Sequence, residues 1–434
     1  MTFLNVTEIE SALIALNATY PTLTQLFKLP NKTYEQRDSH ALLIRGNPSF
    51  DCRPALVFVS GAHAREWGGP DILVNLAADL LEGYTTNAGL AYGAKMFSAQ
   101  EIKTIVDRTD VVVLPDINPD GRAYSMAALP ATTQAMWRKN RNPASSGGVA
   151  LKIGVDVNRN YDFLWDFPVK FSPSANMNTL ASTNPASDLF HGTGPFSEPE
   201  SRNVQWLVDH FPNARYFVDV HSYSGDVLHP WGDDENQTTT PSKSFANPAW
   251  DGKRGVASDA YSEYVPATRL AELAAAANVM RDGINAVRGQ SYVTKQGFWL
   301  WGQTYPTSGT SEDWAFTREF LDPNKGKLDG FVIEFNPSFD FFPAWTDMVD
   351  MIADIDAGLL ALCAYARPSL LQVILCWIVD LLNWIKSGFW AIWHRVFPPE
   401  LWGPYGPWTQ IVRTAERIAN RIRSFVSRIA GRGR

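Results

Sequence analysis

Two residues near the start of this sequence, His63 and Glu66, have the types and spacing of metal ligands. They lie three positions apart in the segment GAHAREW, directly after an apolar run. In a turn or at a helix start, this spacing directs both side chains to one side. Zinc accepts an imidazole nitrogen and a carboxylate oxygen at about 2.0–2.2 Å. Alone, however, the His-x-x-Glu pattern is weak, and it more often describes a surface histidine beside a solvated glutamate.

A third metal ligand has to come from a distant part of the chain. His221 ends the apolar run YFVDV and opens the segment HSYSG. The sequence contains only seven histidines, so two of them at predicted strand ends carry weight. With His63 and Glu66, His221 completes a His2Glu set, which in catalytic zinc sites leaves one coordination position open. The sequence therefore predicts a site for one zinc ion per chain.

Glu334 interrupts the otherwise apolar run FVIEF at 331–335. An unpaired carboxylate is costly in such a run, so a partner or a catalytic role is expected for it. The remaining polar candidates are weaker when each is taken alone. Taken alone, the basic segment WRKNRN at 137–142 is typical of a solvated loop, and the segment at 158–160 is typical of a turn. Tyr305 alone is typical of a core residue. Only the combination of these residues favours a functional site.

These residues need a scaffold that brings distant segments together. Short apolar runs predict buried strands at 41–44, 55–61, 111–118, 216–222 and 331–335. Helical patterns occur at 70–83, 99–107, 267–288 and 344–366, and the N-terminus reads as an amphipathic helix capped near Thr7 or Glu8. This alternation predicts an α/β fold, a single large domain with a mixed, mostly buried central sheet flanked by helices. Long connections at 125–155, 165–200 and 225–266 are expected to build the site at the strand ends.

Seven segments then point to a known family. They occur in the order GAHAREW, INPDG, WRKNRN, GVDVNRNYDF, VHSYSG, TYPTSGTSEDW and VIEF. In this order they resemble the zinc metallocarboxypeptidases of the carboxypeptidase A/B type, over roughly residues 5–366. The resemblance implies a carboxypeptidase-like fold, one bound zinc ion, and hydrolysis of the C-terminal peptide bond of peptides or proteins. His63, Glu66 and His221 match the family's zinc ligands.

The resemblance also implies a set of residues that bind the substrate. Asn158 and Arg159 match the pair that holds the substrate's terminal carboxylate, and the planar guanidinium fork suits a bidentate grip on that group. Tyr305 matches the mobile tyrosine that closes over the substrate. Arg65 matches an arginine that helps to bind extended peptides, and Arg138 is expected to contact the substrate as well.

Three further residues match groups that take part in the reaction or support the metal. Glu334 matches the general base, which takes a proton from water and delivers it to the leaving amine. Arg141 matches the arginine that stabilises the oxyanion. Asp156 matches a carboxylate that accepts the other ring N–H of His63 and so orients this ligand.

Glu312 matches the position at the base of the family's side-chain pocket. An aliphatic residue there accompanies apolar or aromatic C-termini in the family, whereas an acid accompanies Lys and Arg. A buried carboxylate attracts a cation and penalises an apolar group, so we expect a preference for C-terminal Lys or Arg. Glutamate is longer than the usual aspartate, however, and Thr310 replaces a usual glycine, which narrows the pocket. The alternative is that Glu312 turns to solvent.

Residues 368–434 differ in composition from the catalytic domain predicted at 1–367. The segment 369–397 is almost wholly apolar, but Asp380 and Lys386 interrupt it, which argues against a membrane-spanning helix. Seven arginines and one glutamate follow between 411 and 434. Basic amphipathic helices bind anionic membrane surfaces. We expect this extension either to contact a membrane peripherally or to pack on the domain or on a second copy.

Composition excludes several classes of protein. A chain of 434 residues with 45% hydrophobic and 19% charged residues is globular, neither disordered nor fibrous. A net charge of -7 argues against a nucleic-acid partner. Three cysteines cannot form a disulfide framework. The N-terminus does not read as a signal peptide, so a cytoplasmic location is the default expectation, although exported relatives are common in the family.

Three other functions remain open from the sequence. A related zinc amidohydrolase could act on small acyl-amino acids or on peptidoglycan peptides, although the intact WRKNR and NRN segments favour peptides. A catalytically silent peptide-binding protein would have lost Glu334 or a zinc ligand, and none is lost here. The third alternative is a membrane-binding protein whose C-terminal extension carries the main function.

Overall fold

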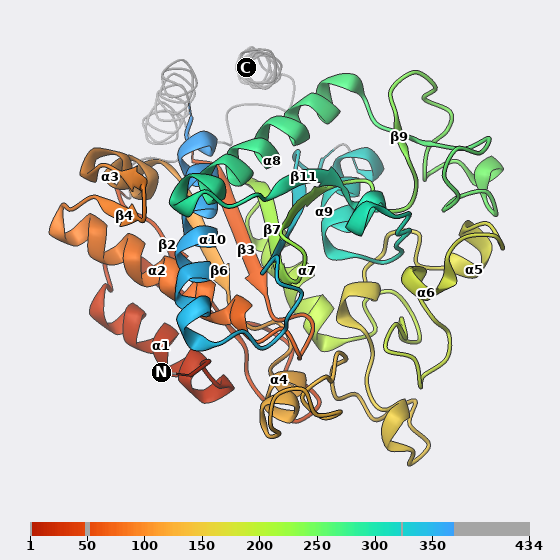
Figure 1. Ribbon diagram of the computed structural model, residues 1–434, viewed down its shortest axis with the longest axis horizontal. Coiled ribbons are helices and arrows are strands. Elements are labelled where there is room, and N and C mark those ends of the chain that lie inside the picture. The colour runs from red at the N-terminus through yellow and green to blue at the C-terminus, as the bar shows by residue number, and fades with distance from the viewer. Residues whose placement is uncertain (1, 48–52, 323, 369–434) are drawn as a thin grey trace, which may run out of the picture. The chain divides into compact units, whose positions relative to one another are not determined.

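An eight-stranded mixed sheet forms the centre of the protein in this computed structural model, which describes residues 2–47, 53–322 and 324–368 (Figure 1). The strand order is β1-β2-β6-β3-β7-β12-β8-β11. The neighbours β6, β3, β7 and β12 run parallel, as do β8 and β11, and the other pairs are antiparallel. The strands are β1 (Thr24–Lys28), β2 (His40–Ile44), β3 (Ala55–Ser60), β6 (Asp110–Leu114), β7 (Ala214–Ser222), β8 (Asp226–His229), β11 (Val293–Gln296) and β12 (Asp329–Phe335).

Helices cover this sheet. The longer ones are α1 (Val6–Thr19), α2 (Gly68–Thr86), α3 (Ala99–Arg108), α4 (Pro119–Met126), α7 (Pro199–His210), α8 (Ala267–Arg288), α9 (Ser311–Leu321) and α10 (Trp345–Ala366). Figure 1 shows α10 beside both α2 and α8, and it packs against each of them. At the crossing with α8, a Cβ atom on Gly283 would come within 2.9 Å of the Ala357 carbonyl oxygen. The absence of a side chain at Gly283 therefore lets the two helices approach closely.

The predicted α/β fold with a mixed central sheet is confirmed. All six residues of β3 and all five of β6 are buried, as expected for apolar strands in the middle of a sheet. All of the predicted helices are present, with ends that differ by a few residues. The strands β1, β8 and β11 were not predicted, because they are short and two of them, β1 and β11, have no buried position.

Thr7 and Glu8 lie near the cap of the N-terminal helix, as predicted. Helix α1 begins at Val6, so Thr7 and Glu8 already lie inside its first turn. The capping residue is Asn5, whose Oδ1 accepts a hydrogen bond from the backbone N–H of Glu8 at 3.1 Å. The Glu8 carboxylate in turn accepts from the backbone N–H of Asn5 at 2.8 Å, which completes a capping box.

The three long connections contain short elements. These are η1 (Ala150–Lys152), α5 (Phe167–Lys170), α6 (Met177–Leu180), β9 (Asn236–Gln237), η3 (Pro248–Trp250) and β10 (Glu263–Tyr264). The remaining short elements are β4 (Leu90–Tyr92), β5 (Lys95–Phe97), η2 (Val157–Arg159) and η4 (Gly297–Gly302). Two of them, η2 and η4, contribute residues to the site described below.

The predicted extension at 368–434 lies outside the described residues except for Pro368, and its membrane or self-association stays a prediction. Cys52 and Cys376 lie outside them as well, whereas Cys363 is buried in α10 as a free thiol. Among the helices that the structure describes, none is both long and apolar enough to cross a membrane.

Candidate metal centre and active site

The carboxyl ends of three adjacent parallel strands bring the predicted site residues together. His221 lies near the end of β7, directly beside Glu334 of β12 in the strand register. The loop that follows β3 supplies His63 and Glu66. Gly61 starts this loop with a φ of +74°, and a Cβ atom there would lie 2.9 Å from an Asp116 carboxylate oxygen. Ligand sites in α/β folds form at this edge of the sheet.

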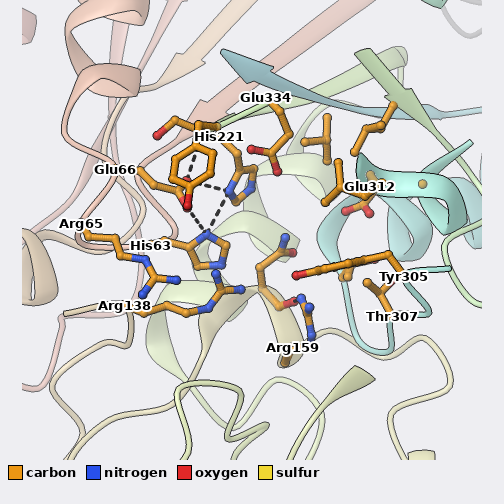
Figure 2. A pocket seen from close by; sticks show the side chains of 18 of the residues that line it. His63, Arg65, Glu66, Arg138, Arg159, His221, Tyr305, Thr307, Glu312 and Glu334 are labelled. Atoms are coloured by element: carbon orange, nitrogen blue, oxygen red, sulfur yellow. Dashed lines mark hydrogen bonds and ion pairs between the residues drawn. The ribbon is translucent and has the colours of Figure 1, made fainter. Parts of the chain in front are cut away.

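His63, Glu66 and His221 form a compact buried group (Figure 2). The His63 Nδ1 atom lies 2.7 Å from one Glu66 carboxylate oxygen, and the His221 Nδ1 atom lies 3.0 Å from the other. The two Nδ1 atoms are 3.1 Å apart. All three donor atoms therefore face one point, as ligands of a single ion must.

The other ring nitrogen of each histidine faces a buried carboxylate. His63 Nε2 lies 3.3 Å from Asp156 Oδ1, and His221 Nε2 lies 3.0 Å from Asp219 Oδ2. Nε2 of each ring therefore faces a carboxylate, and Nδ1 is the ring atom that faces the metal group. Two imidazole nitrogens and one carboxylate are a donor set that zinc accepts, so these residues fit the ion.

The charges of Glu66 and of the two histidines shift one another's pKa values. Burial alone would raise the pKa of Glu66, but the adjacent His63 and His221 outweigh burial and hold it well below its usual range. Burial would lower the pKa of His221, yet the carboxylates of Asp219 and Glu66 raise it well above its usual value. The site therefore keeps Glu66 ionised, as a metal ligand must be.

A cavity of about 350 Å³ opens over the metal group. Every substrate-binding residue predicted from the sequence lines it, namely Arg65, Arg138, Asn158, Arg159, Tyr305 and Glu312, and so does Glu334. Figure 2 shows Arg65 and Glu312 on opposite sides of the metal group. Residues on both sides of the metal group therefore line the cavity.

Glu334 reaches the cavity from β12, and its side chain is partly exposed there. Removal of water by the surrounding protein raises the pKa of this carboxyl to about 8, and the charge of Glu66 adds to the effect although His221 opposes it. A bound divalent cation would lower this pKa again, because it is the largest charge in such a site. The Glu334 carboxyl therefore lines the cavity beside the metal group and has a raised pKa.

Arg138 and Arg141 lie in different surroundings. The expectation that Arg141 stabilises the oxyanion therefore needs correction. Arg138 lines the cavity, and its Nε donates to Asp156 Oδ2 at 2.9 Å. Arg141 is not among the lining residues, and its guanidinium lies over the Tyr124 ring, 3.8 Å from the centroid. The two arginines are three positions apart in a segment without helix or strand structure, so sequence spacing could not tell which one faces the site.

Arg159 is held rigidly at the cavity wall. Its guanidinium donates to the carbonyl oxygens of Leu180, Thr179 and Asn158 at 2.7, 2.8 and 2.7 Å. A guanidinium has five N–H donors, so two of them make no hydrogen bond within the described residues. Two N–H groups in a fixed fork suit one carboxylate.

Glu312 lies in the first turn of α9 and does not turn to solvent, since only 8% of it is exposed. Burial raises its pKa, and the charge of Asp219 adds to the effect. Its Oε2 atom has no hydrogen-bond partner among the described residues. The apolar residues Leu228, Leu300 and Val332 line the same cavity. The pocket thus combines apolar walls with an unsatisfied carboxylate.

Tyr305 and Arg65 lie at the cavity rim. Tyr305 packs on the apolar wall residues and against the ring of Trp301, with 5.2 Å between the ring centroids. The Arg65 guanidinium lies 4.8 Å from the centroid of the Phe341 ring and 3.3 Å from an Asp188 carboxylate oxygen. Both side chains therefore sit where they can contact a bound peptide.

Two buried residues of the site, Asp219 and Ser311, were missed in the sequence. Asp219 precedes His221 by two positions in β7, so both side chains lie on one face of the strand. Ser311 donates its hydroxyl hydrogen to Asp219 Oδ2 at 2.7 Å. The signal for Asp219 was present, because a carboxylate in the apolar run YFVDV needs a partner just as Glu334 does.

Comparisons with known proteins agree with this geometry. The sequence pattern described as zinc carboxypeptidase matches residues 9–333, so the chain belongs to the zinc carboxypeptidase family. Carboxypeptidase B of Astacus astacus is 31% identical over 226 residues, which are 52% of this chain and 63% of that protein. An inactive metallocarboxypeptidase of Arthroderma otae is 29% identical over 210 residues, 46% of this chain and 30% of that protein.

A solved structure shows the same fold. Bovine thrombin-activatable fibrinolysis inhibitor, in complex with tick carboxypeptidase inhibitor, matches with a TM-score of 0.60 at 18% identity, over 84% of this chain and 97% of that one. The two sequence relatives are matched over less than two thirds of their own length. One of them is named inactive, so membership of the family does not by itself establish activity.

The metal group leads to a first prediction. Chelator-treated protein is expected to bind one zinc ion per chain, because three buried donor atoms face one point. Replacing His221 with Ala should abolish this stoichiometric binding, which metal analysis after dialysis measures. The control is His191→Ala, since His191 is also buried but stacks on Trp165 and does not belong to the group. Equal zinc content in both variants would contradict the assignment.

Proposed function

We propose that this protein is an active zinc metallocarboxypeptidase that hydrolyses the C-terminal peptide bond of peptides or proteins. The observation that carries the proposal is the position of Glu334. This carboxylate pairs in register with the metal ligand His221 and lines the same cavity as Arg159. A silent binding protein would not need an acid-base group with a pKa raised to about 8 beside its metal group.

Arg159 supports cleavage at a chain end rather than within a chain. Its two remaining N–H groups offer a bidentate grip on a carboxylate, and an internal peptide bond presents no such group nearby. Asn158 lines the cavity next to it. Figure 2 shows Tyr305 directed toward Arg159, so its hydroxyl can approach a bound chain end.

The reaction assigns distinct tasks to the residues of this chain. When bound, zinc supplies a Lewis acid that polarises the scissile carbonyl and lowers the pKa of water. Glu334 accepts the proton of the attacking water and then donates it to the leaving amine nitrogen. The cavity walls hold the peptide so that its scissile carbonyl faces this carboxylate, and Arg159 fixes the chain end.

Arg138 takes the oxyanion role in this proposal. Its guanidinium lines the cavity, and its hydrogen bond to Asp156 aims it and neutralises that buried carboxylate. A positive charge already fixed at the cavity wall stabilises a developing oxyanion without reorganisation. Arg141 lies over the Tyr124 ring instead, so it has no part in the reaction.

The pocket at Glu312 supports a preference for C-terminal Lys or Arg. A cationic side chain can lay its methylene groups along Leu228 and Leu300 and bring its charge to the Glu312 carboxylate. This contact would satisfy the partnerless Oε2 atom and offset the burial that raises the pKa of Glu312. An apolar side chain leaves the carboxylate buried and unpaired, which costs free energy.

The general-base assignment is tested by Glu334→Gln. This change keeps the shape of the side chain but removes the proton acceptor, so kcat should fall by about 10²–10⁴-fold or more. Release of C-terminal residues from a peptide mixture measures it, and zinc content measured in parallel should remain at one ion per chain. Full activity in this variant would overturn the mechanism.

The two arginines give a second test of the mechanism. Arg138→Ala should lower kcat by about 10²–10³-fold through loss of oxyanion stabilisation, whereas Arg141→Ala should change it by less than about twofold. Zinc content is measured in both variants, because Arg138 also contacts Asp156. A large loss in Arg141→Ala with little loss in Arg138→Ala would restore the assignment expected from the sequence.

Specificity is tested with peptides that differ only in their last residue. Turnover of peptides ending in Arg should exceed that of peptides ending in Phe, and Glu312→Gln should reduce this ratio by about tenfold or more, since it removes the attracting charge. The ratio of kcat/KM values is the measured quantity. Equal or better cleavage of the Phe peptide by the unmodified protein would exclude the basic preference.

A further inference from the structure

Asp219 is a fully buried carboxylate in β7 for which the resemblance to the family assigns no role. Its Oδ2 atom lies 3.0 Å from His221 Nε2 and accepts a hydrogen bond from the Ser311 hydroxyl at 2.7 Å. Its Oδ1 atom has no hydrogen-bond partner within the described part of the chain. The Ser311 hydroxyl is therefore the hydrogen-bond donor to this carboxylate, and the His221 ring lies within ion-pair distance of it.

Polar contacts continue from Ser311 to the other metal histidine. The backbone N–H of Ser311 donates to Asn158 Oδ1 at 2.8 Å, and the backbone N–H of Asn158 donates to Asp156 Oδ1 at 3.0 Å. The same Asp156 atom lies 3.3 Å from His63 Nε2. An unbroken series of contacts thus joins the outward-facing nitrogens of both histidines, and Ser311 lies in its middle.

The Ser311 hydroxyl takes part in this series of contacts and does not cap helix α9. Serine near a helix start commonly caps the helix, but the capping position of α9 is Thr310, and the Ser311 hydroxyl donates to Asp219 in β7, 92 positions away in sequence. The hydroxyl and the backbone N–H of Ser311 contact two different partners. Ser311 therefore fixes the distance between β7 and the turn η2 behind the metal group.

A carboxylate behind a metal-binding histidine sets the orientation of the ring and increases the basicity of the donor nitrogen. It can do so only while it keeps its own position. Because Oδ1 of the buried Asp219 carboxylate has no hydrogen-bond partner among the described residues, its Oδ2 atom needs a hydrogen-bond donor. The Ser311 hydroxyl is that donor.

We propose that Asp219 and Ser311 are positioning residues for zinc binding. Asp219 holds the His221 ring so that Nδ1 faces the ion, and Ser311 holds Asp219 although it touches none of the three ligands. The inference rests on the zinc site of the proposed function, but it concerns metal affinity and not turnover.

The test is the zinc dissociation constant of the full chain, measured without substrate by competition with a chelator of known affinity. Asp219→Asn keeps the shape and removes the charge, and it should weaken binding about 10–100-fold. Ser311→Ala should weaken binding about three- to tenfold through the loss of one hydrogen bond behind Asp219. The matched control is Ser308→Ala, because Ser308 is buried nearby but its hydroxyl donates to the Leu164 carbonyl at 2.8 Å.

The outcomes separate this inference from the proposed function. A zinc dissociation constant within twofold of the unmodified protein in both Asp219→Asn and Ser311→Ala would overturn the positioning role. Equal weakening in Ser308→Ala would overturn it as well, because the effect would then be one of general packing. An unmodified protein that binds no zinc refutes the metal site itself. Circular dichroism of each zinc-free variant verifies that it is folded. If Asp219→Asn does not fold, the zinc dissociation constant of Ser311→Ala alone tests the positioning role.

Discussion

Burial of an ionised carboxylate between two imidazoles is the interaction on which the rest of the site depends. Glu66 is 4% exposed, and water cannot stabilise its charge. His63 and His221 stabilise the charge of Glu66 instead. The outward-facing nitrogen of each ring lies next to a further buried carboxylate, that of Asp156 or Asp219. A bound divalent cation would stabilise the Glu66 charge as well, because it is the largest charge in such a site.

The sheet explains how this charge arrangement can be built. Because β3, β7 and β12 are adjacent and parallel, their carboxyl ends deliver the metal ligands and Glu334 to one edge. The strands themselves are mostly buried, and the loops and short turns at this edge add Arg138, Arg159 and Tyr305. Burial at this edge of the sheet also raises the pKa of Glu334.

Much of this arrangement could be predicted from the sequence. The apolar runs of β3, β7 and β12 identified the central strands, and the motifs identified the metal group and the cavity residues. The choice between Arg138 and Arg141 could not be made, because both lie in one basic segment and only the tertiary structure decides which faces the cavity. Ser311 could not be found either, because its partner Asp219 is distant in sequence. The half-buried strand β1 lacks the apolar run that identified the others.

The most direct measurement of the central claim is anomalous diffraction at the zinc edge from crystals of the zinc-loaded protein. A single strong peak between His63 Nδ1, His221 Nδ1 and the Glu66 carboxylate is predicted, with Asp156 and Asp219 behind the two rings. No peak at this position in zinc-saturated crystals, or a peak at other residues, would contradict the account.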